Sequence, residues 1–156
     1  MTSAQVRIYF DTNVFIYALE ASGPFAENCE RLLRLCQNHP DTAFTSELTL
    51  AEVLCKVEAD RDIALKRAYL NLLLWSNAVT LLPITRSILI ESARLRAHHP
   101  VKLNLADAIH AVTAIEQKCT AFISNDEGIY MPSGGPEKRK PDLSTLSFIS
   151  RLLTSD

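Results

Sequence analysis

Short runs of apolar, β-forming residues alternate with longer segments of helical periodicity along this chain. The runs occupy residues 6–10, 43–45, 79–83 and 120–123. Between them, apolar residues recur at every third or fourth position, which is the spacing of one helix face. Parallel strands need a long crossover connection, usually a helix, whereas antiparallel strands can be joined by a tight turn. The alternation therefore predicts an α/β fold with a parallel central sheet flanked by helices.

Ordinary start and stop signals mark the expected helices. Gly23 breaks the chain, and Pro24 suits a first helical turn because its missing N–H is not needed there. Ser46 and Asn104 are suitable helix N-caps. Helices are expected after Asp11 and over residues 24–39, 48–57, 62–76, 86–98 and 105–118. Residues 131–141, rich in Pro, Gly and charge, are expected to form a loop, and residues 143–149 a last short strand.

The chain has the length of one domain. Its 156 residues can bury a core without stabilising disulfides or metals. No linker or repeat divides them, so a single domain over residues 1–156 is expected. No apolar run approaches the roughly 18 residues that span a bilayer, and the polar first residues do not resemble a signal peptide. We therefore expect a cytoplasmic protein without membrane association. No C-x-x-C pair occurs, so buried, reduced thiols are expected at Cys29, Cys36, Cys55 and Cys119.

The net charge of −2 limits how the chain can bind nucleic acid. Proteins that bind phosphates by charge alone are usually basic, so binding here would need a local basic patch or bound cations. Two groups of basic residues could contact RNA phosphates, although solvated surface charge is the default explanation for both. These groups are Arg86, Arg94, Arg96, His98, His99 and Lys102, and Lys138, Arg139 and Lys140.

Four acidic residues fall where a parallel sheet would bring them together. Asp11 directly follows the first strand, and Asp126 follows a later one. Glu52 lies on the helix after the second strand, and Asp107 lies in a first helical turn, three residues after Asn104. Ligand sites of open parallel sheets form outside the carboxyl ends of strands, where the strand order reverses. We therefore expect the four acids to share one pocket.

A cluster of carboxylates favours a bound divalent cation. Like charges a few Å apart raise one another's pKa, and Mg²⁺ or Mn²⁺ removes that conflict because hard cations prefer carboxylate oxygens. Such an ion activates water and neutralises charge on a phosphate. Carboxylates without a catalytic Cys or Ser indicate phosphodiester hydrolysis rather than acyl transfer.

Each acid also has an ordinary structural explanation. Asp11 suits a helix N-cap. Asn104 and Asp107 together resemble a capping box, and an acid in the first turn favours the helix dipole. Glu52 projects away from its helix's apolar residues, as a solvent-facing glutamate would, and Asp126 suits a turn. The spacing alone leaves both interpretations open.

Four motifs resemble those of PIN domains, and they occur in the family's order. They are YFDTNVFI (residues 9–16), LAEV (50–53), LADAIHA (105–111) and FISND (122–126). The third match is the most specific. The fourth has Ser124 where a Thr is more usual. Together the motifs cover about residues 6–129, most of the chain.

The resemblance implies a PIN-like, Rossmann-like three-layer fold and a Mg²⁺- or Mn²⁺-dependent endoribonuclease. Asp11 and Asp107 would be the principal metal ligands, and Glu52 and Asp126 would complete the acidic pocket, so that all four are candidate catalytic residues. The implied supporting residues, which would orient ligands or substrate, are Asn13 and Ser124.

The single-domain form is most similar to VapC-type toxins of prokaryotic toxin–antitoxin pairs. That likeness implies an RNA substrate and a cognate antitoxin. The apolar segment 69–75 exceeds one buried helix stripe, which indicates either a deep core helix or a homodimer or antitoxin contact. The alternative function is a catalytically idle PIN-like scaffold that binds RNA or protein. His110 is interpreted as a helix-face or core histidine rather than a metal ligand.

Two other enzyme classes fit the residues poorly. The chain has four glycines, and none forms a phosphate-binding turn after the first strand, as a nucleotide-binding α/β protein requires. An enzyme that transfers phosphate through a nucleophilic Asp11 would need a second acid at position 13, where Asn13 stands.

Overall fold

The computed structural model describes residues 5–155, which contain one five-stranded parallel sheet. Its order is β3-β2-β1-β4-β5, so the predicted α/β fold with a parallel sheet is confirmed. The chain builds outward from β1 to β3 and then crosses back to place β4 on the other side of β1. The strand order therefore reverses between β1 and β4. The strands are β1 (Ile8–Phe10), β2 (Ala43–Ser46), β3 (Thr80–Leu82), β4 (Ala121–Ile123) and β5 (Glu137–Arg139).

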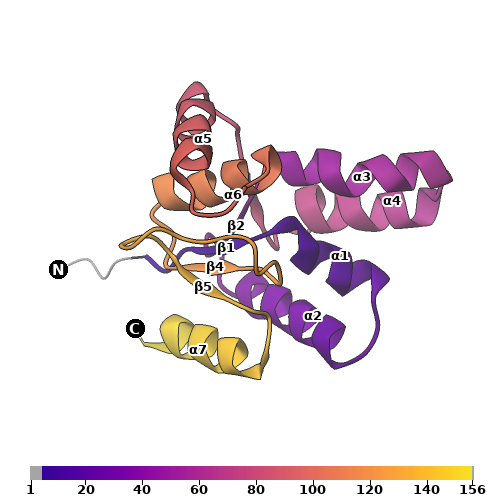
Figure 1. The fold of residues 1–156 in the computed structure, drawn as a ribbon. Coiled ribbons are helices and arrows are strands. Elements are labelled where there is room, and N and C mark those ends of the chain that lie inside the picture. The colour runs from indigo at the N-terminus through magenta and orange to yellow at the C-terminus, as the bar shows by residue number, and fades with distance from the viewer. Residues whose placement is uncertain (1–4, 156) are drawn as a thin grey trace.

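Helices cover both faces of the sheet and complete three layers (Figure 1). In this view α5 and α6 lie above the sheet and α2 and α7 below it, while α3 and α4 form a pair at one end. The helices are α1 (Thr12–Glu20), α2 (Pro24–Gln37), α3 (Leu48–Asp60), α4 (Ile63–Leu70), the π-helical turn η1 (Asn71–Trp75), α5 (Arg86–His98), α6 (Leu105–Glu116) and α7 (Leu143–Thr154).

Alternating side chains of the central strands divide the core between the two faces. Ile8 and Phe10 point to the face covered by α1, α2 and α7, where they join the larger apolar cluster. Tyr9 points to the opposite face, towards α6, and its ring stacks on Phe122 with 5.2 Å between the centroids. A strand that is buried on both faces is typical of parallel sheets. This arrangement fixes β1 rigidly, with its carboxyl end at the middle of one sheet edge.

Side-chain caps define several helix starts. Asn104 caps α6 as predicted, because its Oδ1 accepts from the backbone N of Asp107 at 2.7 Å. Ser46 instead ends β2, and the N-cap of α3 is Glu47. The Ser46 hydroxyl still accepts from the backbone N of Leu48 at 3.0 Å. The predicted cap position was therefore wrong by one residue, although the hydroxyl serves the same helix end.

The C-terminal part of the fold differs from the sequence-based expectation. The strand predicted over residues 143–149 is part of helix α7, whose start is capped by the carboxylate of Asp142. Its buried residues Thr145, Leu146, Ile149 and Leu153 follow a helical repeat. The last strand, β5, instead lies inside the predicted loop. Its sequence Glu-Lys-Arg has no apolar pattern that would indicate a strand. It forms an edge strand because its backbone pairs with β4.

The cysteines and the helix lengths bear on two further expectations. All four thiols are free, and three are buried, but Cys55 is exposed, so the expectation of burial was wrong for that residue. Within residues 5–155, no helix is long and apolar enough to cross a membrane.

Candidate active site

The centre of the candidate site is the reversal point between β1 and β4. Asp11 follows β1 directly, and its backbone N donates to the carbonyl of Ile123 at 3.0 Å. The Asp11 side chain is only 5% exposed. Its Oδ1 accepts from the backbone N of Thr12 at 2.8 Å, so Asp11 is also the N-cap of α1. The capping and catalytic interpretations of Asp11 are therefore compatible.

Asn13 and Ser124 hold the second oxygen of Asp11. Asp11 Oδ2 accepts from Ser124 Oγ at 2.7 Å and from Asn13 Nδ2 at 3.2 Å. The Asn13 amide also donates to Ser124 Oγ at 3.1 Å. The same hydroxyl accepts from the backbone N of Asp126 at 3.0 Å. These contacts join the first and fourth motifs and orient the Asp11 carboxylate, whereas a role in orienting substrate stays a prediction.

Burial and charge act in opposite directions on Asp11. Burial raises the pKa of its carboxyl group, and nearby His110, Ser124 and the backbone N of Thr12 lower it without cancelling that effect, so the pKa remains above its usual value. A buried carboxylate with several donors but no partner cation is expected in a site that receives positive charge from a ligand.

Asp107 reaches the site from the first turn of α6. Its carboxylate Oδ2 accepts from the side-chain Nδ2 of Asn104 at 2.7 Å, whereas a capping box would use the backbone N of the cap residue. Burial, followed by the negative charges of Asp126 and Asp11, raises the pKa of Asp107 to about 6. The acids of the first, third and fourth motifs therefore lie close enough to repel one another.

Glu52 lies on α3 and is one-third exposed, but one of its oxygens is turned inward. Its Oε1 lies 2.6 Å from His110 Nε2 and accepts from Thr12 Oγ1 at 2.8 Å. Burial alone would raise the pKa of Glu52, but the hydrogen bond and charge of His110 and the hydroxyl of Thr12 lower it overall. Glu52 is therefore neither a fully solvated glutamate nor a carboxylate without a partner.

His110 is the functional feature that the sequence reasoning missed. It is a buried core residue of α6, 1% exposed, as expected, but it also lies 3.8 Å from Asp11 Oδ1. Its Nδ1 forms a 2.7 Å hydrogen bond with the hydroxyl of Tyr9. Because a carboxylate can only accept, Nε2 must carry the proton that bonds to Glu52. The spacing of three residues from Asp107 was the available signal, since it places both side chains on one side of the helix.

Lys138 is the basic residue that lies beside the acids. Its ammonium group donates to the backbone carbonyl of Asp126. Burial lowers the pKa of Lys138, and the charges of Asp126 and Asp11 oppose that shift. Arg139 and Lys140, predicted with it as phosphate contacts, pair instead with Glu137 and Glu127. Only one member of this basic run therefore adjoins the site.

The fold thus brings the four predicted acids together at one sheet edge, and we call Asp11, Glu52, Asp107 and Asp126 the acidic cluster. Hard carboxylate oxygens and the raised pKa of Asp107 fit a divalent cation, because such an ion would relieve the repulsion. Within residues 5–155, however, no three His, Cys, Asp or Glu side chains are already arranged as a metal-binding group. The chemistry of the donor set fits the ion, because all four side chains offer carboxylate oxygens.

Comparisons with known proteins agree with this architecture. Solved structures similar to the chain include a toxin–antitoxin complex from Klebsiella pneumoniae, with 22% identity and a TM-score of 0.62 over 86% of this chain and 97% of that one. VapBC2 from Rickettsia felis, bound to a promoter DNA fragment, has 16% identity and a TM-score of 0.66 over 86% and 98%. VapC20 from Mycobacterium tuberculosis, a toxin that cleaves the sarcin–ricin loop, has 15% identity and a TM-score of 0.65 over 83% and 99%.

At these identities the structural likeness shows a shared fold. No curated protein matches the chain by sequence. The family model of the PIN domain matches residues 8–132, which include all four acids of the acidic cluster and well over half of the chain. The chain therefore belongs to the PIN-domain family.

Proposed function

We propose that this protein is a metal-dependent endoribonuclease that hydrolyses RNA phosphodiester bonds. The single observation that supports this most is the acidic cluster, in which carboxylates from distant parts of the chain meet at the strand reversal. Burial there, together with the charges of Asp126 and Asp11, raises the pKa of Asp107 to about 6. Folding has placed like charges together at a cost in stability, which is typical of a functional site. Membership of the PIN-domain family supports a nuclease reaction.

Asp11 and Asp107 would be the principal ligands of a Mg²⁺ or Mn²⁺ ion, with Glu52 and Asp126 contributing directly or through water. When bound, the ion supplies Lewis-acid activation of water and neutralises charge on the scissile phosphate. Ser124 and Asn13 keep the Asp11 carboxylate pointed into the site through their hydrogen bonds to Oδ2. His110 and Thr12 do the same for Oε1 of Glu52.

The chain's own residues also suit an anionic substrate at this edge. Lys138 brings a positive charge beside Asp126, where it would attract a phosphate that approaches the acids. In the metal-free chain the raised pKa of Asp107 lets its carboxyl group hold a proton in mildly acidic solution. A bound cation would favour the charged form of Asp107.

We also propose that the protein is the toxin of a type II toxin–antitoxin pair, acting on RNA in the cytoplasm. Support comes from the likeness to the toxin–antitoxin complexes named above. A homodimer or antitoxin contact would use the end of the apolar segment 69–75. Tyr69 and Leu73 are buried there, but Leu74 is 47% exposed and Trp75 is 63% exposed. Part of the apolar excess therefore belongs to the core and part remains for a partner.

The test is cleavage of RNA by the wild-type protein with Mg²⁺ or Mn²⁺, compared with Asp11→Asn and with Asp60→Asn. Asp60 is an exposed acid at the end of α3 and is the matched control for loss of one negative charge. We expect cleavage by the wild type and by Asp60→Asn, and almost none by Asp11→Asn. Equal cleavage by all three proteins, or none by any of them with either metal, would reject the nuclease.

A second candidate is a PIN-like scaffold that binds RNA or protein without cutting. It is favoured by the carboxylates' existing partners, because Asp11 and Glu52 already accept hydrogen bonds from protein groups and no metal-binding group is preformed within residues 5–155. RNA binding by a wild-type protein that never cleaves would support it.

A further inference from the structure

An open groove separates α2 from α7, on the face of the sheet opposite α5 and α6. Its cavity volume is about 690 Å³, and its floor is formed by one leucine of each helix. None of its lining residues belongs to the acidic cluster. The polar lining consists of Arg31, Arg34 and Asn38 from α2, and Ser147, Ser150 and Arg151 from α7.

The groove is positively charged although the whole chain is mildly acidic. No carboxylate lines it, and all three arginines are exposed. Among the described residues, none of these arginines lies within 4.0 Å of an Asp or Glu oxygen. Within residues 5–155, the one polar contact of their side chains is from Arg151 Nε to the Ser147 carbonyl at 3.4 Å. The guanidinium groups are therefore available to a ligand that brings negative charge.

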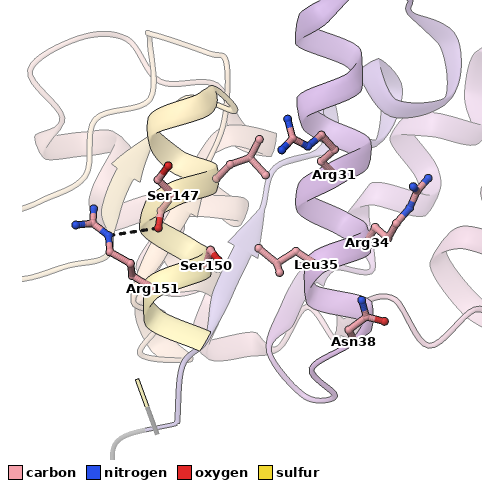
Figure 2. A pocket seen from close by; sticks show the side chains of 8 residues that line it. Arg31, Arg34, Leu35, Asn38, Ser147, Ser150 and Arg151 are labelled. Carbon is pink, nitrogen blue, oxygen red and sulfur yellow. Dashed lines mark hydrogen bonds between the residues drawn. The ribbon is translucent and has the colours of Figure 1, made fainter. Parts of the chain in front are cut away.

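The positions of the guanidinium groups indicate the shape of that ligand. Figure 2 shows Arg31 leaning across the gap towards α7, while the guanidinium groups of Arg34 and Arg151 lie along the two outer sides. Charges spread in this way do not converge on one small anion. They match a row of phosphates, which arginine binds through two parallel N–H groups. The serine hydroxyls and the Asn38 amide are further donors of the kind that contact phosphate oxygens.

We propose that this groove is a second RNA-contact surface, which binds the phosphodiester backbone of the substrate away from the acidic cluster. The inference rests on the proposed function for its choice of RNA as the polyanion. One wall of the groove, α7, lies beyond residues 8–132 that match the PIN-domain model. The contact would favour RNA large enough to reach both surfaces.

The direct test measures binding of labelled single-stranded RNA in EDTA, over a series of salt concentrations. The groove variant carries Arg31→Gln, Arg34→Gln and Arg151→Gln. Its control carries Arg61→Gln, Arg67→Gln and Lys118→Gln, which remove the same charge from exposed positions outside the groove. We expect the groove variant to bind about tenfold more weakly or worse, with a salt dependence smaller by about 2 in log–log slope for three lost phosphate contacts. The control should stay close to wild type.

Cleavage assays with Mn²⁺ separate this inference from the nuclease proposal. For a long RNA, the groove variant should show a raised KM and an unchanged kcat, and a dinucleotide too short to reach the groove should be cut at the wild-type rate. Equal losses of RNA affinity in the two variants, or no loss in either, would overturn the groove proposal. So would binding of poly-glutamate as tight as that of RNA. If the protein binds RNA through the groove but cuts no RNA, the groove proposal is supported and the nuclease proposal is rejected.

Discussion

The acidic cluster consists of two pairs of carboxylates in different surroundings. The inner pair, Asp11 and Glu52, accept hydrogen bonds from Ser124, Asn13, Thr12 and His110. The outer pair, Asp107 and Asp126, have fewer donors and repel each other, which contributes to the raised pKa of Asp107. The difference indicates a division of tasks, because the inner pair is held in place by the protein while the outer pair needs an added positive charge.

The largest expected effect is the loss of cleavage when the outer pair is broken. Asp107→Asn keeps an oxygen for the Asn104 contact but removes the charge, so we expect activity to fall by about 1,000-fold, which is roughly 4 kcal/mol in the barrier. Single-turnover cleavage with saturating Mn²⁺ measures this. A variant that keeps more than a tenth of the activity would show that the outer pair is not needed for the chemistry.

The inner pair can be broken through the residue that supports it. His110→Ala removes the partner of both Glu52 and the Tyr9 hydroxyl and leaves a cavity in the core, so we expect a loss of about 3 kcal/mol in the free energy of unfolding. Urea unfolding followed by circular dichroism measures it. His98→Ala, on the exposed end of α5, is the control and should change stability by less than about 0.5 kcal/mol. If both substitutions reduced the free energy of unfolding equally, the hydrogen bonds of His110 would not contribute specifically to stability.

A divalent cation should stabilise the folded state through the outer pair. At a concentration about 100 times its Kd, an ion that binds only the folded chain adds about 2.7 kcal/mol. We therefore expect Mn²⁺ to raise the Tm of the wild-type protein and to leave that of Asp107→Asn nearly unchanged. Thermal unfolding with Mn²⁺ and with EDTA makes the measurement. A wild-type Tm that is the same with Mn²⁺ and with EDTA would contradict the proposed metal site.

The smallest effect is a pH dependence of opposite sign for Asp107 and Glu52. The folded-state pKa of Asp107, about 6, lies above its ordinary value of 3.8, so its contribution to stability is present below pH 3.8 and is lost as the pH rises through 6. Asp107→Asn should therefore raise the free energy of unfolding at pH 7 by about 1 kcal/mol, since partial exposure weakens the effect, and change it little at pH 4.

Glu52 should behave in the reverse way, because its folded-state pKa is lowered. Its contribution is present above its ordinary pKa and is lost as the pH falls through the lowered one. Glu52→Gln should therefore reduce stability at pH 7 rather than increase it. Urea unfolding in EDTA at both pH values compares the two variants. If both substitutions changed the free energy of unfolding at pH 7 in the same direction, the predicted difference between Asp107 and Glu52 would be wrong.

Much of this arrangement could be predicted from the sequence because it depends on strand ends. Asp11 comes directly after a buried strand, and the reversal of strand order beside it follows from the connections of a doubly wound sheet. Such positions can be inferred from apolar runs and their boundaries. The meeting of Asp11 with Asp107 and Asp126 could therefore be expected before any coordinates.

The rest depends on contacts that leave no local pattern. The sequence around His110 does not distinguish it from other residues on the buried face of its helix. Its partner, the Tyr9 hydroxyl on β1, lies 101 positions away in the chain. Lys138 belongs to a charged run that pairs with β4 through its backbone. Tertiary pairing decided both of these features. Helix α7, predicted as a strand, differs from them because the Asp142 cap and the helical spacing of its buried residues are local signals.

The central place of β1 has a consequence for synthesis of the protein. Its two neighbours, β2 and β4, come from residues 43–46 and 121–123. Strand β4 is synthesised late, so β1 lacks one of its two neighbours during most of translation. Asp11 and Asp126 cannot meet until β4 has docked, and nearly four-fifths of the chain must be translated first. A nascent chain therefore carries Asp11 and Glu52 long before the acidic cluster can assemble.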